Sequence, residues 1–84
     1  MWYAYVLQSK QDKKLYTGCT NDLRTRFKLH NDGKVPATKF RRPLILIYYE
    51  AYMNKNDAFE REKWLKSGWG RNYLKKVLRN YFRF

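Results

Sequence analysis

The sequence predicts an α/β fold: a small three-stranded, mostly antiparallel sheet flanked by helices, in the order β-β-α-β-α-α. Two observations lead to this prediction. Two runs of aromatic and β-branched residues open the chain and a third lies in its middle, and helix-like segments with capping residues follow the second and third runs. The chain also has only 84 residues, enough for one hydrophobic core. We therefore expect residues 1–84 to form a single domain.

The first part of the chain is expected to form a hairpin followed by a helix. The run "WYAYVL" (Trp2 to Leu7) is a strand, the polar "QSKQDKK" is the hairpin loop, and "LYTG" is a short second strand that ends at Gly18. Thr20 is the expected N-cap of the helix, because its hydroxyl suits a first-turn N–H group. The helix should run to about Asp32, with Gly33 as the C′ residue.

The second part is expected to contain one strand and two helices. After the basic loop "KVPATKFRRP", the run "LILIYYEAY" (Leu44 to Tyr52) is the strongest strand, and its lack of polar alternation predicts that both faces are covered. Asn54 and Asp57 resemble a capping pair that opens a helix ending at Ser67. A last helix is expected around Arg71 to Tyr81. Its apolar stripe consists of Leu74, Val77, Leu78 and Tyr81.

The chain is strongly basic, with 19 Lys and Arg against 7 Asp and Glu and a formal net charge of +12. Such charge repels itself in a compact state, so we expect a polyanionic partner. Nucleic acid fits best, since basic side chains on phosphates release condensed counterions. An acidic membrane surface is the alternative, but no separate amphipathic segment or anchor stands out.

Cysteine content and the N-terminal run exclude further classes. Cys19 is the only cysteine, so neither an internal disulfide nor a cysteine-rich metal site is expected. The run "MWYAYVLQSK" lacks the charged and apolar regions of a signal peptide, which predicts a cytoplasmic protein.

Helical periodicity separates the polar residues of the first predicted helix by face. At 100° per residue, His30 falls about 20° and Arg26 about 60° from Leu23, which marks the apolar stripe. Arg24 and Lys28 point away from this stripe. Arg26 and His30 therefore share an edge of the buried face.

The second predicted helix shows the same pattern with a carboxylate. Glu62 falls about 40° from Ala58 on the inner stripe, whereas Glu60 lies on the far side. An ionised carboxylate that faces a core is costly unless it is paired or binds a cation. The simplest partners for it are Arg61, Lys63 and Lys66.

Each of these residues also has a structural explanation when taken alone. A histidine near a helix C-terminus complements the helix dipole, and this suffices for His30. Tyr5 and Tyr16 would serve as sheet aromatics, and Arg26 as part of a solvated basic face. Their occurrence together is harder to explain in this way.

The residues occur in the order and spacing of four known motifs. "YAY" (Tyr3 to Tyr5) stands at the first motif and "YTG" (Tyr16 to Gly18) at the second. The pattern L-x-x-R-x-x-x-H-N is met by Leu23, Arg26, His30 and Asn31. The pattern A-x-x-R-E-x-x-L-K is met by Ala58, Arg61, Glu62, Leu65 and Lys66. Through these motifs, nearly the whole chain resembles the small stand-alone members of the GIY-YIG nuclease superfamily.

The chain departs from the family pattern at a few positions. Tyr3 and Ala4 replace the Gly and Ile of the first motif, Thr17 replaces the Ile of the second, and Cys19 stands where some relatives have lysine. A helical asparagine of several relatives has only Asn72 as its candidate, at an imperfect offset.

The resemblance implies a metal-dependent endonuclease that hydrolyses DNA phosphodiester bonds, with a structure-specific role in repair or recombination. Its catalytic residues would be Tyr5, Tyr16, Arg26, His30 and Glu62. Glu62 would bind Mg²⁺ or Mn²⁺ with one carboxylate, and Arg26 would bind the scissile phosphate. Gly18 would let the backbone approach the substrate.

The resemblance leaves the general base open between Tyr16 and His30. We favour His30, because histidine titrates near neutrality, with Tyr16 and Tyr5 positioning water and phosphate. Substrate choice would come from DNA shape, from loops or from a protein partner. The residues expected to hold the nucleic-acid backbone are Gly18, Arg24, Lys28, Lys39, Arg41, Arg42, Lys75 and Arg79. The alternative function is a non-catalytic nucleic-acid-binding module on the same fold.

Overall fold

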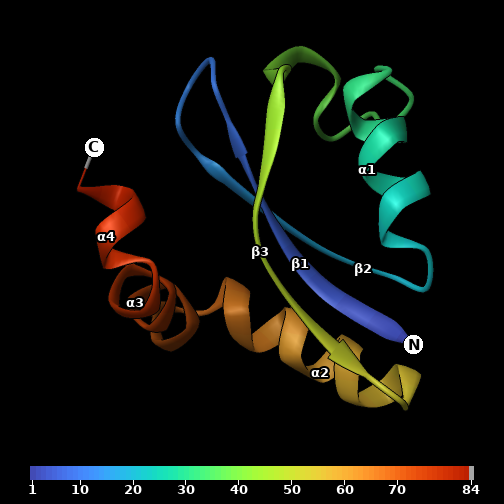
Figure 1. Ribbon diagram of the computed structural model, residues 1–84, viewed down its shortest axis with the longest axis vertical. Helices are drawn as coiled ribbons and strands as arrows, with labels where there is room; N and C mark the ends of the chain where they lie inside the picture. The colour runs from blue at the N-terminus through green and yellow to red at the C-terminus, as the bar shows by residue number, and fades with distance from the viewer. Residues whose placement is uncertain (84) are drawn as a thin grey trace.

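The structure, a computed structural model, describes residues 1–83 and contains one sheet and its covering helices (Figure 1). In chain order, the elements are β1 (Trp2–Ser9), β2 (Leu15–Thr20), α1 (Leu23–Asn31), the short 3-10 helix η1 (Lys39–Arg41), β3 (Leu44–Tyr52), α2 (Lys55–Lys66), α3 (Gly68–Val77) and α4 (Arg79–Phe82). The sheet is antiparallel throughout, with the strand order β2-β1-β3. The predicted fold class is confirmed.

The central strand β1 separates two hydrophobic clusters. Ala4 and Val6 pack on one face of the sheet against Leu65 of α2 and Leu74 of α3. The alternating residues of β1 face the other way, as the period of a strand requires. This second cluster is formed by Tyr5, Leu7 and Leu44, with Leu23 and Phe27 of α1 packed against it. In Figure 1 the sheet accordingly lies between α1 and the α2–α3 pair.

The prediction that both faces of Leu44–Tyr52 are covered is wrong. This run forms β3, an edge strand, and its Tyr49 is 54% exposed. The central strand is β1, in which every residue from Ala4 to Leu7 has at most 1% of its surface exposed. Tyrosine explains the error, because its ring packs like an apolar side chain while its hydroxyl stays in contact with water.

The second strand is longer than predicted and changes the helix cap. β2 continues past Gly18 to Thr20, which pairs with Tyr3 of β1, so Thr20 is not the N-cap. Instead, the carboxylate of Asp22 accepts the N–H of Thr25 at 3.2 Å. The predicted C-terminal end is close to the observed one, since α1 ends at Asn31 and Gly33 follows with a φ of 77°.

The last predicted helix begins earlier than expected. α3 starts at Gly68 rather than near Arg71, because Ser67 caps it and its Oγ accepts the N–H of Gly70 at 3.2 Å. A Cβ atom on Gly70 would lie 2.1 Å from the carbonyl oxygen of Trp64. Glycine therefore permits the close corner between α2 and α3. The predicted helix of Asn54 to Ser67 is observed as α2, with Asn54 as its cap.

The predicted stripe of the last helix is only partly buried. Leu74 is buried and Leu78 packs against the same cluster, but Val77 and Tyr81 are 43% and 40% exposed. The helix is interrupted at Leu78, after which α4 follows a new direction and turns Tyr81 outward. Within residues 1–83, no helix combines the length and apolar character needed to cross a bilayer.

Candidate active site

A buried hydrogen-bonded pair forms the base of the site. The hydroxyl of Tyr5, on the central strand, lies 2.9 Å from Nε2 of His30, near the end of α1. Both side chains are buried, with at most 1% of their surface exposed. The helical face predicted for His30 therefore faces the sheet, as expected from its angle to Leu23.

A third residue extends this pair into the loop that follows α1. Oγ1 of Thr38 lies 2.7 Å from Nδ1 of His30, and Thr38 is fully buried. Both imidazole nitrogens are thus engaged inside the protein. Sequence reasoning missed Thr38, because a single threonine in a basic loop carries no periodic or spacing signal.

Burial controls the protonation of the pair. Burial, with a further contribution from the charge of Arg26, lowers the pKa of His30 to about 4, so its imidazole is neutral near neutral pH. Burial raises the pKa of Tyr5 to about 12, although Arg26 acts in the opposite direction. Tyr5 therefore remains a phenol and can donate its proton to His30.

Gly18 is explained by its contact with this pair. It lies opposite Tyr5 in the β1–β2 ladder, and a Cβ atom there would lie 2.4 Å from the Tyr5 hydroxyl. Gly18 is also buried. Its missing side chain thus makes room for Tyr5, and its predicted contact with substrate stays a prediction.

Three further residues surround the pair. The ring of Tyr16 meets the His30 ring edge-on, with centroids 5.1 Å apart, and Tyr16 and Arg26 are both half-buried. Arg26 lies one turn before His30 on α1, and Glu62 lies on α2, which packs against β1 and β2. Tyr5, Tyr16 and His30 thus contact one another, Arg26 lies on the same helix as His30, and Glu62 lies on the helix that packs against the strands of Tyr5 and Tyr16.

Glu62 has both a partner and access to solvent. Its side chain is 15% exposed, and Oε2 lies 2.9 Å from Nζ of Lys66, one turn further along α2. Lys66 itself is largely exposed, and exposed ion pairs of this kind contribute little to stability. As predicted, Glu60 lies on the exposed face of the same helix.

The sequence of the chain matches a known protein family. The profile of the GIY-YIG catalytic domain matches residues 1–76. The chain belongs to the GIY-YIG family. It therefore carries the domain of a nuclease family.

Small bacterial proteins are similar to this GIY-YIG chain. UPF0213 protein CPE1444 of Clostridium perfringens is 42% identical over 81 residues, which cover 95% of this chain and 76% of the relative. UPF0213 protein SH2523 of Staphylococcus haemolyticus is 41% identical over 66 residues, or 77% and 79% of the two chains. The solution NMR structure of UPF0213 protein BH0048 from Bacillus halodurans has a TM-score of 0.56 at 33% identity and covers 92% of this chain and 85% of that chain.

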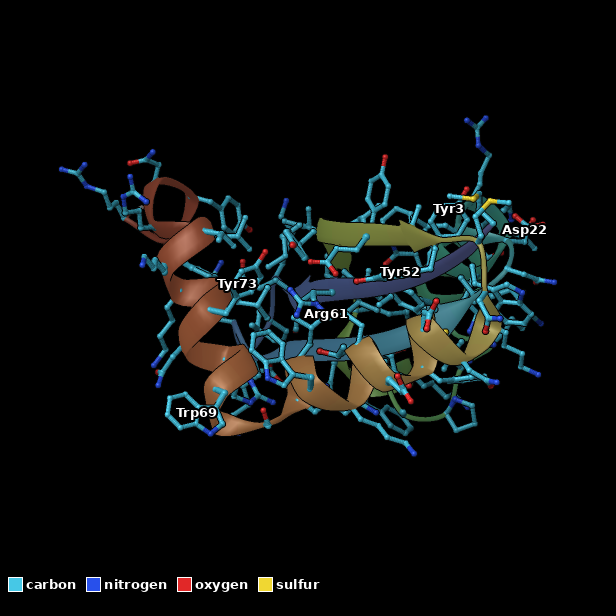
Figure 2. All side chains as sticks on the ribbon, turned by 90° about the horizontal axis from the view of Figure 1, so that it is seen from below. Tyr3, Asp22, Tyr52, Arg61, Trp69 and Tyr73 are labelled. Carbon is cyan, nitrogen blue, oxygen red and sulfur yellow. The ribbon has the colours of Figure 1, made fainter. Side chains whose placement is uncertain are left out.

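The GIY-YIG motif residues do not all lie in the site. Arg61 directly precedes Glu62, yet it points to the other side of α2, where Nε and Nη2 donate to Glu50 at 2.8 and 3.1 Å. Figure 2 shows Arg61 between Tyr52 and Tyr73, at the junction of α2, β3 and α3. Asn72 is exposed on α3.

The donor set of the GIY-YIG site fits a metal held by one carboxylate. No group of three or more His, Cys, Asp or Glu within residues 1–83 is arranged to hold a metal ion. Glu62 is the one carboxylate among the five predicted catalytic residues, and Lys66 would have to release it for a cation to bind. Mg²⁺ commonly keeps several waters and binds through one or two carboxylates and substrate phosphates, so the arrangement suits a hard divalent cation.

The predicted basic residues for nucleic-acid binding divide into two groups. Arg24 and Lys28 are exposed on α1, where Lys28 pairs with Asp32 at 2.6 Å. The others lie on the loop around η1 or on the last two helices. They are Lys39, Arg41, Arg42, Lys75 and Arg79.

Proposed function

We propose that the chain is a Mg²⁺- or Mn²⁺-dependent endonuclease that hydrolyses DNA phosphodiester bonds in branched DNA, as in repair or recombination. The observation that carries this proposal is the contact of the half-buried Tyr16 with the buried Tyr5–His30 pair, with Arg26 one turn before His30 on α1 and Glu62 on the neighbouring α2. A phenol, a guanidinium and a carboxylate are the groups that bind a water, a phosphate and a cation. Membership in the GIY-YIG family supports the same reaction class.

In this proposal, two half-buried side chains contact the reacting groups. Arg26 donates two hydrogen bonds to the scissile phosphate and offsets the charge that develops in the transition state. Tyr16 acts as the general base: its phenolate oxygen binds the attacking water and accepts a proton from it. Glu62 would hold the divalent cation, which would supply positive charge to stabilise the leaving oxygen.

His30 receives a different role from the one its sequence favours. It has no exposed surface and both ring nitrogens are engaged, so it does not contact the attacking water. We assign it to positioning, because it holds the Tyr5 hydroxyl and packs edge-on against Tyr16. Of the two tyrosines in the site, Tyr16 is the one with exposed surface, and it is therefore the base we propose.

The test is cleavage of end-labelled flap, four-way-junction, duplex and single-stranded DNA in the presence and absence of Mg²⁺, with RNA of the same sequence alongside. Glu62→Gln and Arg26→Ala are expected to lower the rate by at least about 100-fold, the range for loss of a transition-state contact. Glu60→Gln is the matched control, because it removes an exposed carboxylate from the same helix. Equal rates for Glu62→Gln and Glu60→Gln would exclude the proposed metal site.

The ion pair of Glu62 with Lys66 favours a second candidate function. Lys66 neutralises the Glu62 carboxylate without a metal ion, as expected for a non-catalytic module that binds nucleic acid through the same fold. This candidate predicts salt-sensitive DNA binding without Mg²⁺-dependent cleavage. Lys66→Gln separates the two, since it should increase cleavage by an enzyme whose Glu62 binds Mg²⁺ and should only weaken binding by a module.

A further inference from the structure

A second basic feature lies between the β1–β2 turn and the last two helices. It is a groove of about 610 Å³, which we call the hairpin groove. Its walls carry five positively charged side chains from the turn, η1 and α3. They are Lys13, Lys14, Arg41, Arg71 and Lys75. The sequence predicts nucleic-acid contacts for Arg41 and Lys75 and assigns no role to the other three.

Most of this charge has no acidic partner. Within residues 1–83, Arg41 is the one groove cation in an ion pair, with Asp12 at 3.2 Å. Arg71 and Lys75 lie one turn apart on α3, a spacing at which like charges destabilise a helix. A groove that concentrates unpaired cations in this way is suited to an anionic ligand.

The turn is held in a fixed shape. Lys13 has a φ of 63°, a left-handed conformation that glycine adopts more easily than lysine. Nε2 of Gln8 donates to the carbonyl of Lys13 at 3.0 Å, and the N–H of Lys13 donates to the carbonyl of Ser9 at 2.9 Å. Tyr81 of α4 donates its hydroxyl proton to Gln8 and thereby connects the two walls. A charged residue thus occupies a position where backbone conformation favours glycine.

The shape of the ligand follows from the floor of the groove and its neighbours. Leu15 and Phe82 provide an apolar surface between the cations, which suits the sugars and bases of a single strand. Leu15 and Tyr16 are successive residues of the edge strand β2 and face opposite sides of the sheet. A single-stranded nucleic acid that crosses the β2 edge of the sheet therefore passes from the groove to Tyr16.

We propose that the hairpin groove binds the phosphate backbone of a single-stranded DNA arm that continues into the candidate active site. This inference rests on the proposed function and makes it more specific, since the preferred substrate is then DNA with a single-stranded flap. The groove contributes affinity and selects DNA that has such an arm.

The test is fluorescence anisotropy of labelled single-stranded and duplex DNA in EDTA, measured over a range of salt concentrations. The double variant Arg71→Gln, Lys75→Gln is compared with Lys63→Gln, Lys76→Gln, which removes equal charge from exposed positions outside the groove. The groove variant should lose about tenfold more single-strand affinity than the control, and its salt slope should fall by about 1.4, because each phosphate contact contributes about 0.7. Equal losses in the two variants would overturn the proposal.

Lys13→Gly provides a second variant that separates binding from folding. It should weaken single-strand binding while leaving the thermal midpoint unchanged or higher, since glycine tolerates a positive φ. Unchanged binding by Lys13→Gly, or displacement of DNA from the wild-type protein by polyglutamate more readily than by unlabelled DNA, would also overturn the proposal.

Cleavage distinguishes the failure of this inference from that of the proposed function. If the wild-type protein cleaves DNA with Mg²⁺ and both double variants lose equal affinity, the groove proposal is wrong and the proposed nuclease activity stands. If the groove variant selectively loses single-strand binding but the wild-type protein does not cleave DNA, the groove proposal stands and the proposed nuclease activity is wrong.

Discussion

Nδ1 of His30 and Oγ1 of Thr38 lie 2.7 Å apart, and neither residue has exposed surface. Because Nε2 of His30 lies 2.9 Å from the Tyr5 hydroxyl, the imidazole connects the central strand to the loop between α1 and η1. The backbone of Thr38 is also fixed, since its carbonyl accepts the N–H of Arg41 at 2.9 Å. The position of the loop is therefore coupled to the base of the candidate active site.

Replacing Thr38 with valine should destabilise the protein. Valine has nearly the same shape but leaves one buried nitrogen of His30 without a partner, which costs about 1–3 kcal/mol of unfolding free energy. The measurement is urea denaturation. Thr38→Ser is the control and should retain most of the stability, because it keeps the hydroxyl. A valine variant as stable as the serine variant would contradict the importance of this hydrogen bond.

His30 should make stability depend on pH in a defined window. Its pKa is lowered from 6.5 to about 4 in the folded state, so the unfolded chain binds the proton more readily between these values. Stability is therefore retained above pH 6.5 and falls as the pH decreases toward 4, by at most about 1.4 kcal/mol per pH unit.

This pH dependence can be isolated because His30 is the only histidine in the chain. His30→Gln should be less stable than wild type at neutral pH, but its unfolding free energy should change much less in the upper part of the window, where carboxylates remain ionised. Urea denaturation at several pH values measures both slopes. Parallel curves for the two proteins would show that His30 is not held neutral in the folded state.

Substitution of Gly18 by alanine should disturb the same cluster from the opposite strand. Its Cβ atom would lie 2.4 Å from the hydroxyl and 2.5 Å from Cζ of Tyr5, so the ring must move. We expect a loss of about 1–3 kcal/mol, typical of an overfilled core. Gly68→Ala is the control, since no atom lies within 4 Å of the new methyl group, and its stability should be unchanged or slightly higher. Thermal denaturation of both variants checks the difference.

The sequence predicted the structural features that depend only on a residue and its neighbours along the chain. Asn54 caps α2 and Gly33 adopts a positive φ after α1, as capping and chirality require. The helical angles of His30 and Glu60 also gave the correct faces, because periodicity alone determines which side of a helix is buried.

The features that sequence reasoning missed depend on contacts between distant segments. Whether β1 or β3 is central is set by how the strands pair, and the apolar run of β3 contains no information about that order. Likewise, Thr38 gains its role only because the loop folds back onto His30. Asp22 replaced Thr20 as the cap, because pairing with Tyr3 extends β2 beyond its local signal.

A network on the opposite face of the sheet gives a structural reason for the arginine of the A-x-x-R-E pattern. Arg61 makes two hydrogen bonds to Glu50, which also accepts the hydroxyl protons of Tyr48 and Tyr52. The Arg61 guanidinium lies 4.2 Å from the ring centroid of Trp64. The guanidinium thus joins β3 to α2 on a partly buried surface.

Replacing Arg61 with lysine should therefore affect stability rather than catalysis. Lysine keeps the charge but provides neither the two-pronged hydrogen bond to Glu50 nor the planar group that stacks on Trp64, so we expect a loss of about 1–3 kcal/mol. Arg79→Lys is the control, because Arg79 is exposed and its guanidinium makes one hydrogen bond, to the carbonyl of Lys76. Urea denaturation measures stability, and Mg²⁺-dependent cleavage is measured well below the unfolding midpoint. A large loss of cleavage in a fully folded Arg61→Lys protein would place Arg61 in the catalytic machinery, contrary to its contacts with Glu50.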